Sequence, residues 1–215
     1  MIKLYYYPDN ASFAPHLLLK ESGLPHELYL VDRKANGQRD AAYLKLNPAG
    51  RIPTLAFGDQ VVFETPAVMI TICEIEGKST FMPPLGHPNR GKFFQWMAYL
   101  NNTLQSEFMV WRYPERHSIT PQGAREVATA QDKRLGDILA LLDNELSNKP
   151  YLLGDQISAC DHFLFMLALW CDGRQSRPAL SFPNLARFMR QMAIRPAVQE
   201  VCRLEGIDLQ PITAG

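Results

Sequence analysis

Residues 47–65 read N-P-A-G-R-I-P-T-L-A-F-G-D-Q-V-V-F-E-T, and the rest of the chain is arranged around this stretch. Its first β-prone run starts directly after Pro53, a residue that strands tolerate at their first position and that accepts a cis peptide bond at modest free-energy cost. Gly58 and Asp59 separate this run from a second one, and glycine at the first central position suits a type II′ turn. The stretch therefore predicts a β-hairpin that is entered through a cis bond between Ile52 and Pro53.

A helix start follows the hairpin directly. Thr65 fits the N-cap position, Pro66 fits the first helical position, and an apolar segment comes next. The N-terminus of a helix carries free N–H groups and partial positive charge, so it can hold a carboxylate. Two interpretations are open: a plain hairpin followed by a helix, or the anion-binding part of a functional site.

The residues before this stretch predict alternating strands and helices. Residues 2–7 and 27–31 are β-prone, whereas 13–23 places apolar residues on one helical face and ends at a glycine. A polar loop then leads to a short helix at 40–46. The expected order, through the helix that follows Thr65, is β-α-β-α-β-β-α. Its first two strands are expected to be parallel, because a right-handed crossover joins them.

The composition changes after this unit. Residues 78–88 are rich in proline and glycine, which indicates a linker. Beyond them, apolar residues recur at steps of three and four in 93–111 and in 135–146, which predicts amphipathic helices. Residues 163–170 are apolar on every side and predict a buried helix. This second part of the chain is therefore expected to be all-α.

The fold class that these patterns predict is α/β followed by all-α. We expect one domain at 1–77, the linker at 78–88 and a helical domain at 89–215. Shorter helices of the second domain are expected to begin near Pro183 and Pro196, each with a proline close to the first helical position.

A capping pattern marks the start of the buried helix. Ser158 is placed as the N-cap and Asp161 as the acidic residue three positions later, and Ile157 can pack against the first turn. We expect this motif to start the helix rather than to perform chemistry, because the capping geometry uses both polar side chains.

Charge, hydropathy and cysteine usage exclude several function classes. The chain has 215 residues, with 22 Lys+Arg and 22 Asp+Glu, so it offers no basic field for nucleic acid. No apolar run approaches the roughly 20 residues of a membrane span, and the first residues fit a strand better than a signal peptide. The cysteines lack metal-type spacing and lie in apolar segments, which is typical of reduced, buried thiols. We therefore expect a soluble cytoplasmic protein without a metal. The cysteines are Cys73, Cys160, Cys171 and Cys202.

The chain resembles the glutathione transferases over nearly its whole length. The segments that carry the resemblance are 47–55, the pair Glu64–Thr65 and the capping segment with Ser158 and Asp161. The resemblance implies a thioredoxin-like N-terminal domain followed by the helical C-terminal domain of that family. Residues 4–8 and 12–16 look most like the bacterial beta class.

The resemblance implies a glutathione site around the hairpin. The backbone of Ile52, before Pro53, would pair with the cysteinyl backbone of glutathione as an added strand does. Glu64 would take the ammonium group of the γ-glutamyl end, and the hydroxyl and N–H of Thr65 would take its carboxylate. Three residues stand where relatives contact the glycine end of glutathione, and they could equally be ordinary solvated loop residues. They are Arg51, Gln38 and Arg39.

The position that activates the thiol departs from the beta class, which carries a cysteine where this chain has Ala11. Ser12 remains as a candidate catalytic donor, and its alternative role is that of an ordinary N-cap. Asn10 is a second candidate donor. Tyr6 matches the catalytic tyrosine of the animal classes, although its alternation with Leu4 also fits a core tyrosine. His16 has no partner that spacing identifies, and no catalytic role is expected for it.

The resemblance implies transfer of the glutathione thiolate to a small hydrophobic electrophile, with a role in detoxification. The electrophile would be bound between the loop after Pro8 and residues 108–113, a segment that could equally serve only in packing. A homodimer is implied, with the helix after Thr65 and the helix at 93–111 as contact surfaces. Two other functions are open: a glutathione-dependent disulfide reductase or peroxidase, and a non-catalytic glutathione-binding or ligand-binding protein.

Overall fold

The computed structural model describes residues 1–78, 80–174 and 176–214. The chain divides into two compact units. Unit 1 contains Met1–Pro84 together with the C-terminal segment from Ala193 onward, and unit 2 contains Leu85–Met192. Each unit has its own buried apolar core.

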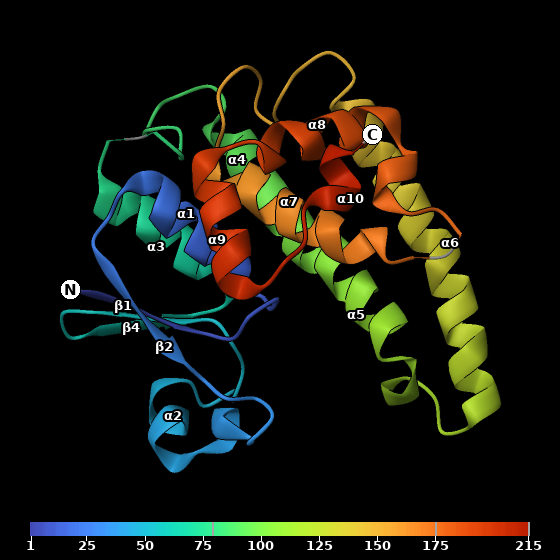
Figure 1. The fold of residues 1–215 in the computed structure, drawn as a ribbon, viewed down its shortest axis with the longest axis horizontal. Coiled ribbons are helices and arrows are strands. Elements are labelled where there is room, and N and C mark those ends of the chain that lie inside the picture. Colours follow the sequence, from blue (N-terminus) through green and yellow to red (C-terminus); the bar gives the residue numbers. More distant parts are fainter. Residues whose placement is uncertain (79, 175, 215) are drawn as a thin grey trace. The chain divides into compact units, whose positions relative to one another are not determined.

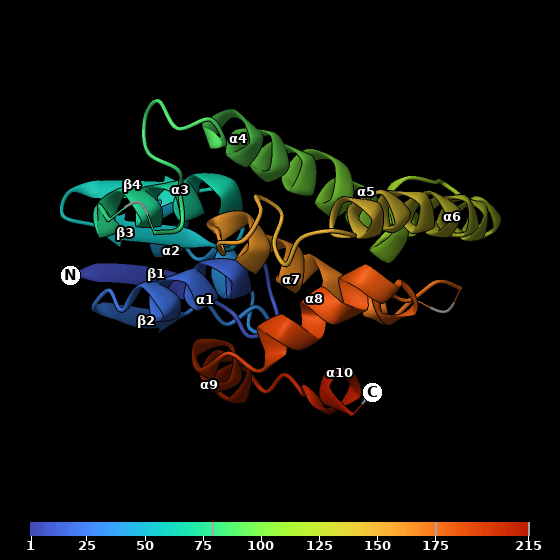
Figure 2. The ribbon, with the colours of Figure 1, turned by 90° about the horizontal axis from the view of Figure 1, so that it is seen from above.

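Unit 1 is built on a four-stranded sheet with the order β2-β1-β3-β4, which can be followed in Figure 2. β1 pairs in parallel with β2 and antiparallel with β3, and β3 pairs antiparallel with β4. The parallel pair predicted for the start of the chain is therefore confirmed. The strands are β1 (Ile2–Tyr6), β2 (His26–Leu30), β3 (Thr54–Phe57) and β4 (Gln60–Phe63).

Helices cover both faces of this sheet. Leu4 of β1 is fully buried on the face toward α1 and α3, and Tyr5 points to the opposite face, where its ring lies 5.8 Å from that of Tyr43 in α2. Figure 1 shows α1 and α3 on one side of the sheet and α2 on the other. The helices that complete the predicted β-α-β-α-β-β-α order are α1 (Phe13–Ser22), α2 (Ala41–Leu46) and α3 (Thr65–Glu76).

The hairpin between β3 and β4 turns as its sequence predicts. Phe57 pairs with Gln60, so Gly58 and Asp59 are the two turn residues. Gly58 has φ 52°, and Asp59 is not among the residues with positive φ, as a type II′ turn requires. The peptide bond between Ile52 and Pro53 is cis.

The predicted linker at 78–88 contains no helix or strand in its described part, and Ser79 lies outside the described residues. Two of its side chains, Phe81 and Met82, are buried. The middle of the described linker is therefore packed against the protein, whereas residues 84–88 are exposed.

Unit 2 is helical. The predicted helix at 93–111 is wrong in one respect, because a π-helical segment, Leu100–Gln105, interrupts it. Within this segment Asn101 and Asn102 are weak helix formers, and the hydroxyl of Ser106 donates to the carbonyl of Asn101. The α-helices are α4 (Arg90–Tyr99), α5 (Ser106–Arg112), α6 (Pro121–Glu145), α7 (Ala159–Asp172) and α8 (Pro183–Ala193).

For two helices of unit 2, the observed start can be compared with the start that the sequence predicts. α6 begins at Pro121, well before the predicted 135–146, with Gly123 N–H donating to the hydroxyl of Thr120. The early turns of α6 are mostly polar, and the apolar side chains on their inner face are small (Ala124, Val127 and Ala128), so the pattern did not reveal them. The capping box predicted at Ser158 and Asp161 is present at the start of α7.

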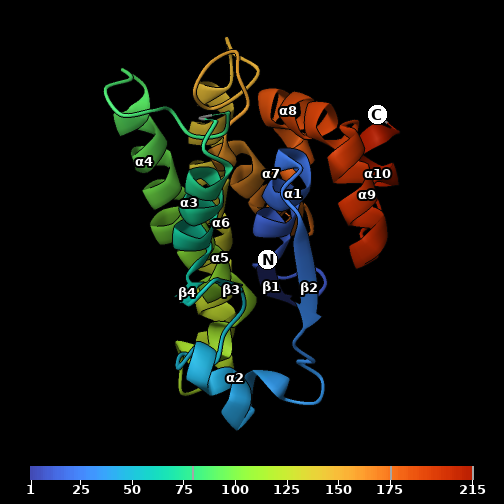
Figure 3. The ribbon, with the colours of Figure 1, turned by 90° about the vertical axis from the view of Figure 1, so that its left-hand side faces the viewer.

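The C-terminal segment returns to unit 1. It contains α9 (Pro196–Glu205) and α10 (Gln210–Thr213), and α9 lies beside α1 (Figure 3). Lys20 Nζ of α1 lies 2.6 Å from Glu200 Oε1 of α9, and Glu21 of α1 pairs with Arg195. No helix in the described part of the chain is long and apolar enough to cross a membrane.

Candidate functional site

The register of the sheet gathers the predicted site residues at one end. Tyr5, Thr54 and Phe63 lie in one row across β1, β3 and β4. β1 and β4 end near this row and β3 begins there. The loop before α1, the residues that precede β3 and the start of α3 therefore come together at the same end of the sheet.

Two helix N-termini are linked at this end. The hydroxyl of Thr65, the first residue of α3, donates to the carbonyl oxygen of Ala11 at 3.2 Å. Ala11 stands just before Ser12, the N-cap of α1. Each helix N-terminus contributes free N–H groups and partial positive charge, so their convergence favours a ligand with an anionic group.

The predicted cap of α3 is wrong by one residue. Glu64 occupies the N-cap position, and Thr65 is the first helical residue, because the Thr65 hydroxyl reaches across to Ala11 instead of capping its own helix. Glu64 has φ 73° and ψ 122°, a conformation that costs a non-glycine residue about 1–3 kcal/mol. Its side chain is exposed. Backbone strain of this kind is typical of functional sites.

Ser12 is fully buried, and its hydroxyl is used within the protein. Oγ donates to the carbonyl of Tyr7 at 3.1 Å and accepts from the N–H of Tyr7 at 3.2 Å. The side chain makes no hydrogen bond to the first turn of α1, so the predicted side-chain cap is absent. Ser12 instead closes the loop that joins β1 to α1.

Asn10 lies at the same loop and is half-buried. Its carbonyl accepts from the N–H of Phe13 at 2.8 Å. In the described part of the chain, its side-chain amide has no hydrogen-bond partner. Asn10 therefore retains a donor that can turn toward a ligand.

Tyr6 packs against α1 rather than standing open at the site. It is half-buried, and its ring centroid lies 6.1 Å from that of His16. It shares the helix-covered face with Ile2 and Leu4, as the alternation of the strand requires. The structure favours the interpretation of Tyr6 as a core tyrosine.

Ile52 and Arg51 stand at the entrance to β3. The side chain of Ile52 is buried with Val31 and Tyr43, and the pairing of β3 with β1 begins only at Thr54. The backbone of Ile52 thus precedes the paired part of the sheet. The side chain of Arg51 is exposed.

Gln38 and Arg39 are brought to this entrance by Gly50. A Cβ atom at Gly50 would lie 2.8 Å from Arg39 Nη1 and 3.0 Å from the Gln38 carbonyl oxygen, and φ is 58° there. Only glycine fits such an approach. Oε1 of Gln38 is buried and has no hydrogen-bond partner among the described residues. The structure thus brings together the predicted residues Arg51, Gln38 and Arg39.

Sequence reasoning missed Glu205, at the end of α9. Its Oε1 lies 2.7 Å from His16 Nδ1, and its Oε2 accepts from the N–H of Asp9 at 3.0 Å. The carboxylate therefore holds the loop that carries Asn10. These partners lie 189 and 196 residues away in the chain, so no local pattern could have revealed the contact.

The aromatic segment at 108–113 makes packing contacts within unit 2 through Phe108. The ring of Phe108 stacks on Trp170 with 5.5 Å between centroids and lies 5.5 Å from Trp111. Tyr113 carries the guanidinium groups of Arg112 and Arg116 over its ring.

None of the cysteines offers a reactive thiol. All four are buried, and burial raises the pKa of Cys73, Cys171 and Cys202 to about 12. A thiol with such a pKa stays protonated and is a poor nucleophile. The described residues contain no group of His, Cys, Asp and Glu that could hold a metal ion.

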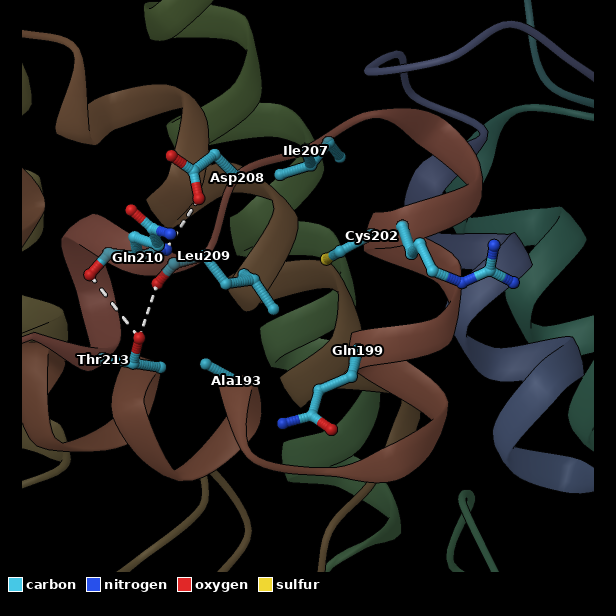
Figure 4. Close-up of a pocket in the computed structure, with 9 residues that line it drawn as sticks. Ala193, Gln199, Cys202, Ile207, Asp208, Leu209, Gln210 and Thr213 are labelled. Atoms are coloured by element: carbon cyan, nitrogen blue, oxygen red, sulfur yellow. Dashed lines mark hydrogen bonds between the residues drawn. The ribbon is translucent and has the colours of Figure 1, made fainter.

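A shallow hollow of about 400 Å³ lies between α9 and α10 (Figure 4). Cys202, Leu209 and Gln210 are among its lining residues, and none of the predicted site residues lines it. The hollow is therefore separate from the candidate site at the end of the sheet.

Two family models match the sequence. The model described as glutathione S-transferase, N-terminal domain, matches residues 12–75, and the one described as glutathione S-transferase, C-terminal domain, matches 85–196. Glutathione S-transferase GstA of Escherichia coli O157:H7 is 27% identical over 208 residues, which cover 96% of this chain and 100% of that protein.

Solved structures agree with these matches. A glutathione transferase homologue from Sulfitobacter with bound glutathione has a TM-score of 0.85 and 25% identity, over 97% of this chain and 99% of that one. The ternary complex of BphK, a bacterial GST, has a TM-score of 0.82 and 31% identity, over 95% of this chain and 100% of that one. The similarity thus extends over nearly the full length of both.

Proposed function

Because this chain belongs to the glutathione S-transferase family of enzymes, we propose that it binds glutathione at the end of the unit 1 sheet and transfers the thiolate to a small apolar electrophile. The observation that carries the proposal is the link between Thr65 and Ala11, which joins the N-termini of α3 and α1 beside the strained Glu64. This arrangement suits a ligand that carries both a carboxylate and an ammonium group.

The γ-glutamyl end is proposed to bind at the start of α3. The exposed carboxylate of Glu64 takes the ammonium group, and the N–H of Thr65 donates to the carboxylate. Since the Thr65 hydroxyl gives its proton to Ala11, the N–H is the donor of Thr65 that the ligand can use.

The cysteinyl and glycine parts are proposed to lie along the entrance to β3. Ile52, beside Pro53, offers its backbone to the cysteinyl residue before the paired part of the strand begins. The exposed cations Arg39 and Arg51 face the glycine carboxylate, and the amide oxygen of Gln38, which has no partner among the described residues, accepts from a ligand N–H.

The thiol is proposed to bind at the N-terminus of α1. A free thiol has a pKa of about 8.5, and N–H donors together with the helix dipole favour its thiolate form. Asn10 is the side-chain donor that has no partner in the described structure, whereas the Ser12 hydroxyl is bound to Tyr7. Ala11 excludes a mixed disulfide between glutathione and the enzyme at this position.

Substitution of Thr65 tests the proposal. Thr65→Val removes the hydroxyl that links the two helices, whereas the matched variant Thr65→Ser keeps it. We expect the valine variant to raise the Kd for glutathione about tenfold and the serine variant to stay within about threefold of wild type, measured by isothermal titration calorimetry. Failure of the wild-type protein to bind millimolar glutathione would overturn the proposal.

A second candidate function is favoured by the buried state of Ser12. If its hydroxyl cannot reach a bound thiol, the protein could bind glutathione without conjugating it. Conjugation of 1-chloro-2,4-dinitrobenzene and of isothiocyanates, compared with the reaction without protein, separates the two functions.

The assembly and location of the protein are part of the same proposal. We propose a cytoplasmic homodimer that uses the surfaces of α3 and of the helix from α4 to α5, where Phe94 is 40% exposed. Light scattering coupled to size-exclusion chromatography tests the dimer, and cell fractionation tests the location.

A further inference from the structure

The turn that enters β3 is held by a cluster of polar side chains. The carbonyl oxygen of Arg51 accepts from Tyr43 Oη at 2.5 Å and from Asn47 Nδ2 at 2.8 Å. Oγ1 of Thr54 lies 2.9 Å from Tyr43 Oη and accepts from Asn47 Nδ2 at 3.1 Å. The cluster therefore holds the chain on both sides of Ile52.

Every proton of this cluster has an acceptor. The single hydroxyl proton of Tyr43 goes to Arg51, so the hydroxyl of Thr54 donates to Tyr43, and the two amide protons of Asn47 go to Arg51 and Thr54. Tyr43, Asn47 and Thr54 are 6%, 1% and 0% exposed. Burial raises the pKa of Tyr43, which keeps its hydroxyl protonated as a donor. A satisfied buried network of this kind is rigid.

Stability alone does not account for polar groups at this place. The surroundings of the cluster are apolar and aromatic, and the carbonyl of Arg51 accepts from two side chains, so loss of one donor would still leave this carbonyl paired. What the polar groups add is a fixed direction for the carbonyl of Arg51. The neighbours that form this apolar surrounding are Val31, Ile52, Tyr5, Tyr7 and Leu46.

The same network sets the position of a second segment. Asn47 Oδ1 accepts from the N–H of Ala49 at 3.1 Å, and its carbonyl accepts from the N–H of Gly50 at 2.9 Å. Gly50 is the residue against which Gln38 and Arg39 lie. The turn that Asn47 shapes therefore fixes the position of the glycine against which the Gln38 carbonyl and the Arg39 guanidinium lie.

We propose that Tyr43 is a positioning residue for glutathione: its hydroxyl, acting with Asn47, holds the backbone of Arg51 and Ile52 in the geometry to which the peptide docks. The inference rests on the proposed function. A residue that holds a docking edge affects the ground state and the transition state alike, so its loss raises KM and leaves kcat unchanged.

The test is Tyr43→Phe, which keeps the ring in the apolar cluster and removes only the hydroxyl. The matched control is Tyr29→Phe on the same face of the sheet, where the hydroxyl donates to the exposed Glu27 at 2.8 Å. We expect Tyr43→Phe to raise the Kd and KM for glutathione about tenfold with kcat within about twofold, and Tyr29→Phe to change neither. Amide hydrogen exchange at residues 49–52 should become faster in Tyr43→Phe alone.

The outcomes separate this inference from the function on which it rests. Absence of glutathione binding by the wild-type protein overturns both. Binding by the wild type together with an unchanged Kd in Tyr43→Phe, or a fall in kcat at unchanged KM, overturns the positioning role alone. If Tyr43→Phe does not fold, Thr54→Val decides by the same criteria, because it removes a hydroxyl of the cluster without changing the size of the side chain.

Discussion

His16 and Glu205 form a buried pair, with 2.7 Å between Nδ1 and Oε1 and side chains that are 1% and 0% exposed. The second oxygen of the same carboxylate accepts from the N–H of Asp9. The last residue of α9 therefore holds α1 and the loop in front of it together. Because that loop carries Asn10, the pair links the end of the chain to the proposed thiol-binding position.

We expect Glu205→Ala to lower the free energy of unfolding by about 3 kcal/mol, because it leaves the buried His16 ring without its Glu205 partner and removes an acceptor of the Asp9 N–H. Urea unfolding measures the change. Glu200→Ala, which removes an exposed partner of Lys20, is the control and should leave the free energy unchanged. Equal effects of the two substitutions would contradict the structural role given to Glu205.

Glu64→Gly should affect stability and binding in opposite directions. Glycine adopts φ 73° without strain, so the free energy of unfolding should rise by about 1 kcal/mol after the added entropy of the unfolded chain is subtracted. The carboxylate for the ligand ammonium is lost, so the Kd for glutathione should rise at least about tenfold. Glu64→Ala is the matched control, since it should lose binding without any gain in stability. A stabilised alanine variant would argue against strain at this residue.

Ser12→Ala should affect the stability of the protein, whereas Asn10→Ala should affect the pKa of the bound thiol. Ser12 uses its hydroxyl on the backbone of Tyr7, so its loss should lower the free energy of unfolding by about 1–2 kcal/mol. Asn10→Ala should leave stability unchanged and raise the apparent pKa of the bound thiol, read from the pH dependence of the thiolate absorbance at 240 nm. If Ser12→Ala instead raised the apparent pKa of the bound thiol and Asn10→Ala did not, Ser12 would be the residue that stabilises the thiolate.

Titration of the buried cysteines should lower the free energy of unfolding at alkaline pH. Burial raises the pKa of Cys73, Cys171 and Cys202 to about 12 in the folded chain, well above that of a free cysteine side chain. Above pH 9 the unfolded chain releases protons that the folded chain retains, so the free energy of unfolding falls as pH rises from about 9 toward about 12. Below pH 9 these thiols contribute no pH dependence.

Urea unfolding at pH 8, 9 and 10 measures this fall, and a variant with alanine at the three positions should show a shallower one. At pH 8 a chromogenic thiol reagent should react with the cysteines only after unfolding. Rapid reaction of the native protein would show an accessible thiol and contradict the burial of these side chains.

The sequence predicts the scaffold of the site well, because its signals are local. Gly58 and the start of α3 are encoded within a few residues of where they act, and the sheet register then places Thr54 beside Phe63. The capping box of Ser158 and Asp161 is equally local.

The rest of the site depends on contacts that no short window contains. Thr65 looks like an N-cap, and its hydroxyl instead crosses to Ala11, 54 residues away. Ser12 looks like a cap or a catalytic donor, and its hydroxyl closes a loop with Tyr7. Side-chain hydroxyls have several acceptors within reach, and only the packed fold decides among them.

Because α9 belongs to unit 1, part of this unit is synthesised only after unit 2. Asp9 and Glu205 lie 196 residues apart, and Glu205 follows unit 2 in the sequence, so the loop between β1 and α1 gains this carboxylate partner only after unit 2 has been synthesised. A fragment ending near Pro84 therefore contains the residues that we propose to bind glutathione but lacks the Glu205 carboxylate that accepts from the N–H of Asp9. We therefore expect unit 1 to complete the proposed glutathione site only after α9 has packed against α1.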